Sequence, residues 1–153
     1  MSKKTTRNKA YGPHLQLDAS SCSRKKLDSI AHIYNVLDEF PEVIGMTKIA
    51  PPRVQKVPAS KNCPEGISGF VIIAESHISI HAYSEIGYLL LDIFSCRDFD
   101  VGEAISFAQE KFEFTEYKIN FKWRGEDYPH DVAAASNINL REHRRAGKKI
   151  GSC

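Results

Sequence analysis

A short central stretch of the chain concentrates side chains that can do chemistry. It contains the pair Glu75-Ser76, a histidine five residues after that serine, His81, and a cysteine twenty residues after it, Cys96. Ile, Val, Leu and Phe dominate the residues around them, so these polar groups should lie in a buried sheet. Burial penalises polar groups that have neither a partner nor a use, so their concentration here indicates a functional site.

Two common kinds of site fit this stretch poorly. His77 and His81 are four residues apart, which on a strand separates them by roughly 13 Å, too far to share one metal ion. Only a helix would bring them together, and the β-branched neighbours oppose a helix. A serine or cysteine hydrolase is also disfavoured, because no Gly-x-Ser-x-Gly elbow is present. We therefore expect no metal at this site.

The block resembles the pyruvoyl-dependent S-adenosylmethionine decarboxylase proenzymes of the prokaryotic type. That family has Glu-Ser at a self-cleavage point, a histidine five residues after the serine and a catalytic cysteine twenty residues after it. Glu75-Ser76, His81 and Cys96 match all three spacings. The similarity also includes the segments 12–15 and 66–69, and it spans roughly residues 11–128.

The resemblance implies that the chain cuts itself into residues 1–75 and 76–153. The Ser76 hydroxyl would attack the Glu75 carbonyl to form an ester, and β-elimination would then lead to a pyruvoyl group, the expected cofactor. The resemblance assigns removal of the Ser76 α-proton to His81, and histidine is the side chain that most often acts as a general base. Ser68 would help to hold the intermediate.

The resemblance also implies roles in turnover. The pyruvoyl carbonyl would form a Schiff base with the substrate amine and accept electrons as carbon dioxide leaves. Cys96 would return a proton to the α-carbon. Glu85 would hold the ribose hydroxyls of the substrate, and Tyr83 would stack on its adenine, whereas His77 is expected to be an ordinary sheet histidine.

The implied function is decarboxylation of S-adenosylmethionine, which supplies the aminopropyl donor for spermidine synthesis, in a homodimer or larger homo-oligomer. Many relatives hold the adenine between two aromatic rings, one of them from the loop before the cleavage strand. Here that loop, residues 59–65, contains no aromatic residue. Decarboxylation of arginine or ornithine is therefore an alternative, and a regulatory binding partner of a decarboxylase is the non-enzymatic one.

One geometric condition accompanies the match. Ser76 and His81 are separated by an odd number of residues, so on one regular strand their side chains would face opposite ways. For the two to meet, the chain must turn or bulge near Ser76.

Three runs rich in β-forming residues surround the block, at 68–74, 77–83 and 87–95, and they predict neighbouring strands. Period-two alternation predicts further strands over 12–18 and 117–124, and residues 47–50 are a candidate short strand. The alternation over 117–124 predicts one face in the core and the other in solvent. The polar, proline-containing residues 53–65 predict a loop.

Two segments predict amphipathic helices. The first should end near Pro41 and bury residues at three- and four-residue spacing, namely Leu27, Ile30, Ala31, Tyr34 and Leu37. The second should begin at the N-cap Asp100, with Glu103 placed as in a capping box. Its expected buried stripe consists of Ala104, Ile105, Ala108 and Phe112.

Helices between groups of strands predict an α+β fold, a two-layer α/β sandwich with a mainly antiparallel sheet and helices on one face. Residues 1–128 should form a single domain, and residues 129–153, where the periodicity fades, a flexible basic tail. We expect reduced cysteines, with Cys22 and Cys63 as small buried hydrophobes.

Composition limits the partners. Residues 1–9 and 141–149 each carry a net charge of +4, which leaves −6 on residues 10–140. An acidic body with basic ends argues against nucleic-acid binding, because phosphate binding needs a basic patch on the folded surface. No apolar stretch reaches the roughly 20 residues that cross a bilayer. We therefore expect a cytoplasmic protein that binds neither nucleic acid nor membrane.

Overall fold

The computed structural model describes residues 10–129, which form two units. The larger unit is Gly12–Arg124. The smaller one contains residues 10–11 and 125–129, where the Tyr11 amide donates to the Gly125 carbonyl at 3.0 Å. The predicted basic tail lies, apart from Pro129, outside the described residues, so its flexibility stays a prediction.

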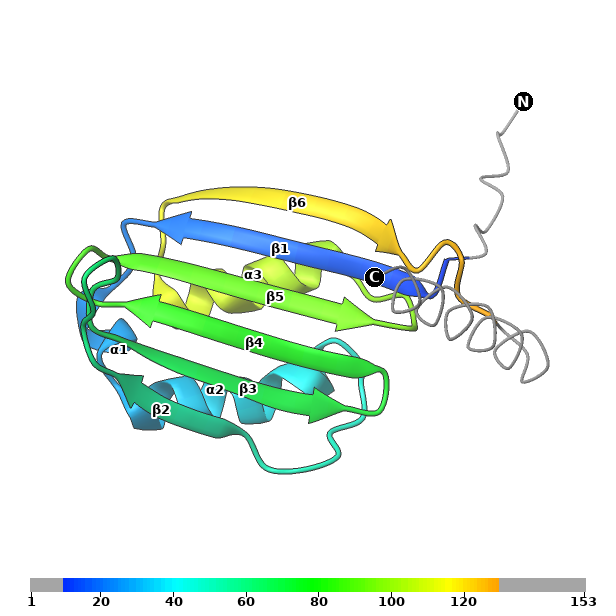
Figure 1. Ribbon diagram of the computed structural model, residues 1–153, viewed down its shortest axis with the longest axis horizontal. Coiled ribbons are helices and arrows are strands. Elements are labelled where there is room, and N and C mark those ends of the chain that lie inside the picture. The colour runs from blue at the N-terminus through cyan, green and yellow to red at the C-terminus, as the bar shows by residue number, and fades with distance from the viewer. Residues whose placement is uncertain (1–9, 130–153) are drawn as a thin grey trace, which may run out of the picture. The chain divides into compact units, whose positions relative to one another are not determined.

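Six strands form one sheet in which every neighbouring pair is antiparallel. The strands are β1 (Gly12–Ser20), β2 (Arg53–Val57), β3 (Gly66–Ile73), β4 (Ser76–Tyr83), β5 (Tyr88–Ser95) and β6 (Glu116–Arg124). Their order across the sheet is β2-β3-β4-β5-β1-β6 (Figure 1). Strands β3, β4 and β5 follow one another in hairpins, so the residues of the central block are brought onto adjacent strands.

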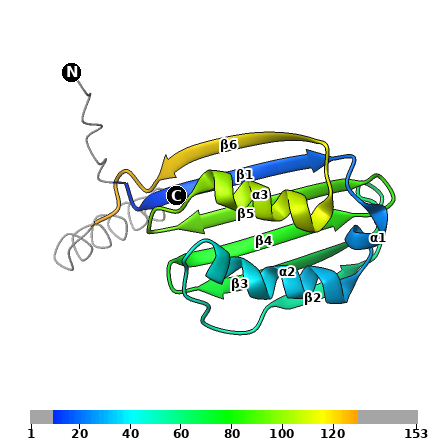
Figure 2. The ribbon, with the colours of Figure 1, turned by 180° about the vertical axis from the view of Figure 1, so that it is seen from behind.

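Three helices cover one face of this sheet (Figure 2). They are α1 (Arg24–Leu27), α2 (Ile30–Val43) and α3 (Val101–Phe112). The other face carries no helix in the described chain, and we call it the open face. This arrangement confirms the predicted two-layer α+β sandwich. None of the helices in residues 10–129 is long and apolar enough to cross a membrane.

The helix starts follow from their capping residues. The Ser29 side chain accepts a hydrogen bond from the His32 amide, and Asp100 accepts one from the Glu103 amide, so both satisfy an N–H that the helix leaves unpaired. The N-cap at Asp100 is confirmed. The first predicted helix is instead two helices, because the chain leaves the helical path between Leu27 and Ile30. Helix α2 ends at Val43, two residues after Pro41.

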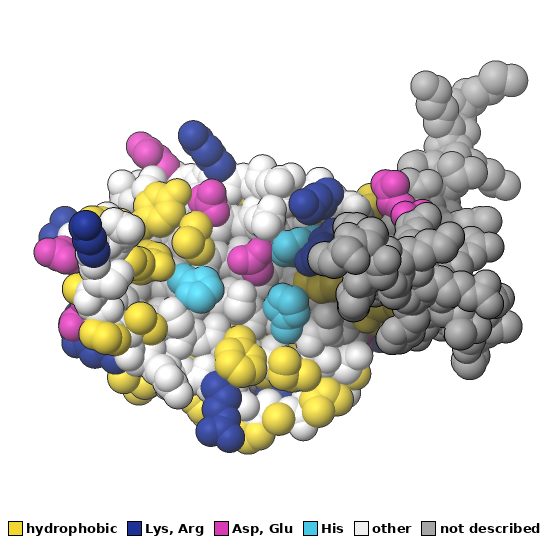
Figure 3. Space-filling view, in the orientation of Figure 1, with side chains coloured by type: hydrophobic (Ala, Val, Ile, Leu, Met, Phe, Trp, Pro, Cys, Tyr) yellow, Lys and Arg dark blue, Asp and Glu magenta, His cyan; other side chains and the backbone are white. Residues whose placement is uncertain are grey.

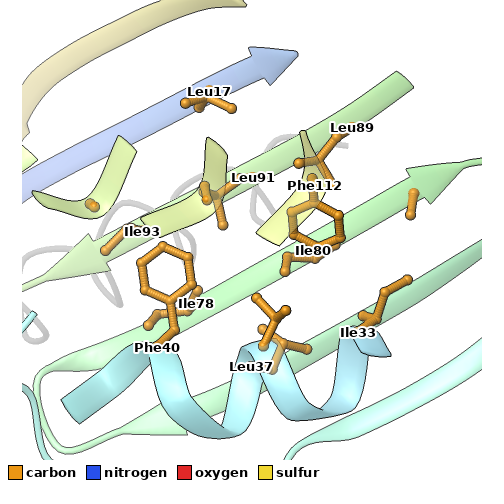
Figure 4. Close-up of a cluster of buried hydrophobic side chains, with 14 of the residues drawn as sticks. Leu17, Ile33, Leu37, Phe40, Ile78, Ile80, Leu89, Leu91, Ile93 and Phe112 are labelled. Carbon is orange, nitrogen blue, oxygen red and sulfur yellow. The ribbon is translucent and has the colours of Figure 1, made fainter. Parts of the chain in front are cut away.

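The core lies between the sheet and the helices (Figure 4). Helix α3 buries Ala104, Ala108 and Phe112 as predicted. Of the stripe predicted for the earlier helix, Leu27 and Leu37 are buried as expected, whereas Ala31 is exposed and Ile30 and Tyr34 are 45% and 37% exposed. The residues of α2 that pack on the sheet are Ile33, Val36, Leu37, Phe40 and Pro41.

Two further corrections concern residues 47–65. Residues 47–50 contribute only an isolated bridge, Lys48 to Ile73, rather than a strand. The predicted loop 53–65 contains strand β2, which pairs along its whole length with β3. Strand β2 forms an edge of the sheet, where polar side chains are tolerated because one side of the strand stays in solvent.

Strand β6 has the predicted alternation but not the predicted burial. All nine of its residues are exposed, including Phe121 and Trp123 at 42% each. The strand is the other edge of the sheet, so only β1 packs beside it. One face of β6 therefore does not belong to the core, contrary to the expectation.

Candidate active site

The peptide bond between Glu75 and Ser76 lies at the hairpin that joins β3 to β4. Ile73 pairs with Ser76, so Ala74 and Glu75 form a two-residue connection and Ser76 is the first residue of β4. On its other side Ser76 pairs with Ser95, the last residue of β5. Cys96 follows directly, and its amide donates to the Glu75 carbonyl at 2.9 Å. The predicted cleavage point and the predicted catalytic cysteine are therefore adjacent.

The Glu75 side chain is held as well as its carbonyl. The residue is only 7% exposed, and its Oε2 accepts a hydrogen bond from the Thr47 amide at 3.1 Å. Its Oε1 lies 3.2 Å from Nη2 of Arg97. The buried Ser95 hydroxyl donates to the Arg97 carbonyl at 2.7 Å and accepts from the Arg97 amide at 3.0 Å, which fixes the chain around Cys96.

A second group of predicted residues lies on the open face. Ser68 pairs with His81 across β3 and β4, and the Ser68 hydroxyl is 2.8 Å from Nδ1 of His81. The two line a pocket of about 470 Å³ together with Phe70, Ile72 and other residues. Figure 3 shows histidine side chains gathered on this face of the sheet. With Nδ1 engaged by Ser68, Nε2 of His81 is the nitrogen that could exchange a proton.

Within one chain the structure does not bring His81 to Ser76. A turn precedes Ser76, as the odd spacing required, but β4 pairs regularly with both neighbours from Ser76 onward and contains no bulge. Five residues along a strand correspond to roughly 16 Å. His81 lies on the open face with Ser79, whereas the alternate positions Ile78 and Ile80 are buried in the core. The turn before Ser76 therefore does not bring His81 to it within one chain.

The residues expected to bind substrate lie near His81 rather than near Ser76. Tyr83 ends β4, and Glu85 lies in the following turn. A side chain at Gly66 would approach the Tyr83 ring to 2.9 Å, so the glycine leaves room for that ring. The Cys63 thiol donates to the Tyr83 hydroxyl at 3.7 Å. Cys63 is exposed, so its predicted burial was wrong, whereas Cys22 is buried as expected.

A polar network that we did not predict lies on the open face beside these residues. Nε2 of the buried His14 is 2.8 Å from Asp92, and Arg124 lies 3.3 Å from Nδ1 of His14. Since arginine can only donate, Nδ1 accepts and Nε2 carries the proton shared with Asp92. The pKa of His77 is lowered, chiefly by burial and then by His14. A neutral His77 packed against Phe94 fits its expected role as a sheet histidine.

We call the Ala74-Glu75 connection with Ser76 the cleavage turn. The sequence analysis did not identify three residues that hold this turn or the neighbouring segment, namely Thr47, Ser95 and Arg97. Thr47 acts through its backbone amide, which carries no residue signature. Arg97 follows Cys96 directly, but nothing in the sequence shows that its side chain reaches Glu75. In residues 10–129, no cluster of three or more histidine, cysteine or acidic side chains could hold a metal ion.

Gly12 offers a test of how tightly the cysteine segment is placed. A Cβ atom at this position would lie 1.8 Å from the Ser95 carbonyl oxygen and 2.7 Å from the Cys96 Cα. Both are backbone atoms, which cannot rotate away as a side chain could. Gly12→Ala must therefore displace either strand β1 or the Ser95-Cys96 backbone, whose Cys96 amide is hydrogen-bonded to Glu75. We expect a loss of about 1–3 kcal/mol of stability, typical of overpacking, together with slower cleavage at Glu75-Ser76. Thermal melting and electrophoresis of the same preparation measure both, and an unchanged melting temperature would contradict the close approach.

Comparisons with known proteins identify the family of the chain. The family model for S-adenosylmethionine decarboxylase matches residues 13–125. An S-adenosylmethionine decarboxylase proenzyme from Methanococcus aeolicus is 36% identical over 90 residues, which cover 59% of this chain and 72% of the relative. An S-adenosylmethionine decarboxylase proenzyme from Clostridium botulinum is 32% identical over 118 residues, which cover 76% of this chain and 97% of the relative.

A solved structure has the same fold. The crystal structure of the adenosylmethionine decarboxylase from Aquifex aeolicus superposes with a TM-score of 0.64 at 24% identity, over 76% of this chain and 92% of the other. The match of the family model over most of the chain confirms the resemblance drawn from Glu75-Ser76, His81 and Cys96. This chain belongs to the S-adenosylmethionine decarboxylase family.

Proposed function

We propose that this protein is a self-processing decarboxylase that acts on S-adenosylmethionine. The observation that carries the proposal is the cleavage turn itself. In a chain of this family, the Glu75-Ser76 bond lies at the end of the β3–β4 hairpin, with its carbonyl hydrogen-bonded to the amide of Cys96. The substrate and the link to spermidine synthesis come from the relatives, which are named for that activity.

In the proposed processing, the Ser76 Oγ attacks the Glu75 carbonyl carbon, the peptide C–N bond breaks and an ester forms. The Cys96 amide is placed to stabilise the negative charge that develops on the carbonyl oxygen. A base then removes the Ser76 α-proton, the Cβ–O bond breaks and Glu75 leaves as a carboxylate. Water replaces the nitrogen of the resulting dehydroalanine, ammonia departs and a pyruvoyl group remains on residues 76–153.

The turn suits this cofactor. Its precursor Ser76 is half-buried at the start of β4 and pairs with Ser95, the residue directly before Cys96. When formed, the pyruvoyl group supplies the electron sink that decarboxylation needs. We propose that the exposed thiol of Cys96 returns a proton to the product's α-carbon.

We further propose that His81 serves as the base for the Ser76 of a second copy of the chain. About 16 Å of strand separates the two residues within one copy, well beyond hydrogen-bond reach. The open face that carries Ser68 and His81 also exposes Phe70 and Ile72, at 46% and 43%. An uncovered sheet face that exposes apolar side chains beside catalytic residue types favours a homodimer that covers this face.

We also propose that the substrate is bound by residues of the second copy. Tyr83 and Glu85 lie at the far end of β4 from Ser76, seven or more residues away. In the proposed dimer they would therefore come with His81, so that each complete site combines Ser76 and Cys96 of one copy with Ser68, His81, Tyr83 and Glu85 of the other.

Turnover of three amino acids tests the substrate. We expect S-adenosylmethionine to release carbon dioxide faster than arginine or ornithine at equal concentration. Glu85→Gln should lower kcat/KM for it by roughly 10- to 100-fold, corresponding to about 1.5–3 kcal/mol for a hydrogen bond to a charged group. Glu110→Gln, on the exposed surface of α3, is the control and should match the wild type.

A preference for arginine or ornithine would replace the substrate while leaving self-processing intact. The loop residue that is hydrogen-bonded to the Tyr83 hydroxyl is Cys63, not an aromatic residue, which is why arginine and ornithine belong in the comparison.

A further inference from the structure

The Glu75 side chain is the buried charged group that the processing chemistry does not use. Only the backbone carbonyl of Glu75 reacts, yet its carboxyl group is buried and makes two contacts of its own, to Thr47 and Arg97. Burying a carboxylate costs free energy that such partners must offset. A two-residue hairpin does not need a glutamate here, because Asn, Asp and Gly are the residues that favour such turns.

The geometry of the turn supports a role for these contacts. The turn types that best fit two-residue hairpins need a positive φ at one or both of the two connecting residues. Here the connecting residues are Ala74 and Glu75, and neither has a positive φ. Contacts from outside the hairpin therefore help to hold it. The Ala74 amide donates to the Thr47 carbonyl at 2.8 Å, and the Thr47 amide donates to Glu75 Oε2. The backbone of Thr47 is therefore hydrogen-bonded to both residues of the turn.

Arg97 also contacts the turn with its side chain. Its backbone is fixed by Ser95, and its guanidinium contacts the Gly45 carbonyl, the Met46 sulfur at 3.7 Å and Glu75 Oε1 at 3.2 Å. The side chain thus ties together the segment before Thr47, the turn and the segment that contains Cys96. Cys96, whose amide donates to the Glu75 carbonyl, directly precedes Arg97 in the chain. A shift of Glu75 relative to Arg97 therefore also shifts the Glu75 carbonyl relative to the Cys96 amide.

We propose that Arg97 is a positioning residue for self-cleavage, which acts by holding the Glu75 carboxylate so that the reacting carbonyl stays on the Cys96 amide. This inference rests on the proposed function. It adds that the side chain of the glutamate before the cleaved bond increases the cleavage rate, and that Arg97, which is not one of the motif residues, contributes to this increase.

The test follows cleavage of the full-length chain after a pulse of cell-free synthesis. Arg97→Ala should slow the appearance of the two products about tenfold, equivalent to about 1.4 kcal/mol of barrier. Glu75→Gln should slow it similarly, and Arg97→Lys, which keeps the charge but not the fork of donors, should fall between Ala and wild type. Lys56→Ala breaks an exposed ion pair with Glu65 far from the turn and should cleave at the wild-type rate.

The double variant separates positioning from general damage. If Arg97 acts through Glu75, Arg97→Ala combined with Glu75→Gln cleaves no more slowly than the slower single variant. Multiplied effects, about 100-fold in the double variant, or wild-type cleavage in Arg97→Ala, would overturn the proposal. Melting of each variant in an uncut Ser76→Ala background checks folding. If Arg97→Ala does not fold, the same cycle is run with Arg97→Lys. A wild-type chain that never cleaves would instead refute the proposed function.

Discussion

Ser76→Ala is expected to leave the protein as one uncut chain of 17.2 kDa without decarboxylase activity. The variant lacks the oxygen that attacks the Glu75 carbonyl, so neither the ester nor the pyruvoyl group can form. The wild type should separate under denaturing conditions into residues 1–75 and 76–153, and the second product should resist N-terminal sequencing because it has no free amine. Mass spectrometry of both preparations measures the effect, which should be complete loss rather than slowing.

The variant should fold, because Ser76 lies at a strand end and no side-chain hydrogen bond of the turn depends on it. Those bonds run through Thr47, Glu75 and Arg97. Ser106→Ala, on the exposed side of α3, removes a serine elsewhere and should cleave like the wild type. Cleavage of Ser76→Ala at the same bond, or an intact wild type after long incubation, would refute the assignment of Ser76.

The parts of the fold that could be predicted are those that local pattern determines. Strands β3, β4 and β5 are short runs of β-branched and apolar residues between turns, and each lies within two residues of its predicted bounds. The N-cap at Asp100 is a contact between residues three apart. Such features need no knowledge of the rest of the chain.

The errors concern features that depend on distant residues. In α2 two sets of apolar residues have helical spacing, and only packing on the sheet selects Ile33 and Phe40 over Ile30 and Tyr34. Strand β2 is polar, and it exists because β3 supplies hydrogen bonds along its whole length. Strand β6 alternates like a buried strand but is exposed because it is at the sheet edge.

The candidate site divides in the same way. The spacing of Glu75, Ser76, His81 and Cys96 pointed to the chemistry, and the register of β3, β4 and β5 shows which of these residues meet. Pairing of Ser76 with Ser95 brings Cys96 to the cleavage turn, and pairing of Ser68 with His81 forms the second group. That the two groups lie apart is a property of a regular hairpin, which residue spacing alone does not reveal.

This separation leads to the prediction that two inactive variants restore each other's processing. His81→Ala retains Ser76 but lacks the base, and should not form a pyruvoyl group on its own. Ser76→Ala retains the Ser68–His81 pair but has nothing to cleave. If the pair acts on the cleavage turn of a second copy, joint expression should place a pyruvoyl group on residues 76–153 of the His81→Ala chain. About half of these chains should be processed if two kinds of subunit pair at random in equal amounts.

Differently tagged chains and mass spectrometry identify which copy has been processed. The matched control joins His81→Ala with a chain that carries both Ser76→Ala and His81→Ala, and it should yield no pyruvoyl group because no copy supplies the base. Two results would exclude action between copies: full processing of His81→Ala alone, or none in the mixture although the two tags purify together. The structure favours restoration, because roughly 16 Å of regular strand keeps His81 from the Ser76 of its own chain, so a His81 that acts on that turn would come from another copy.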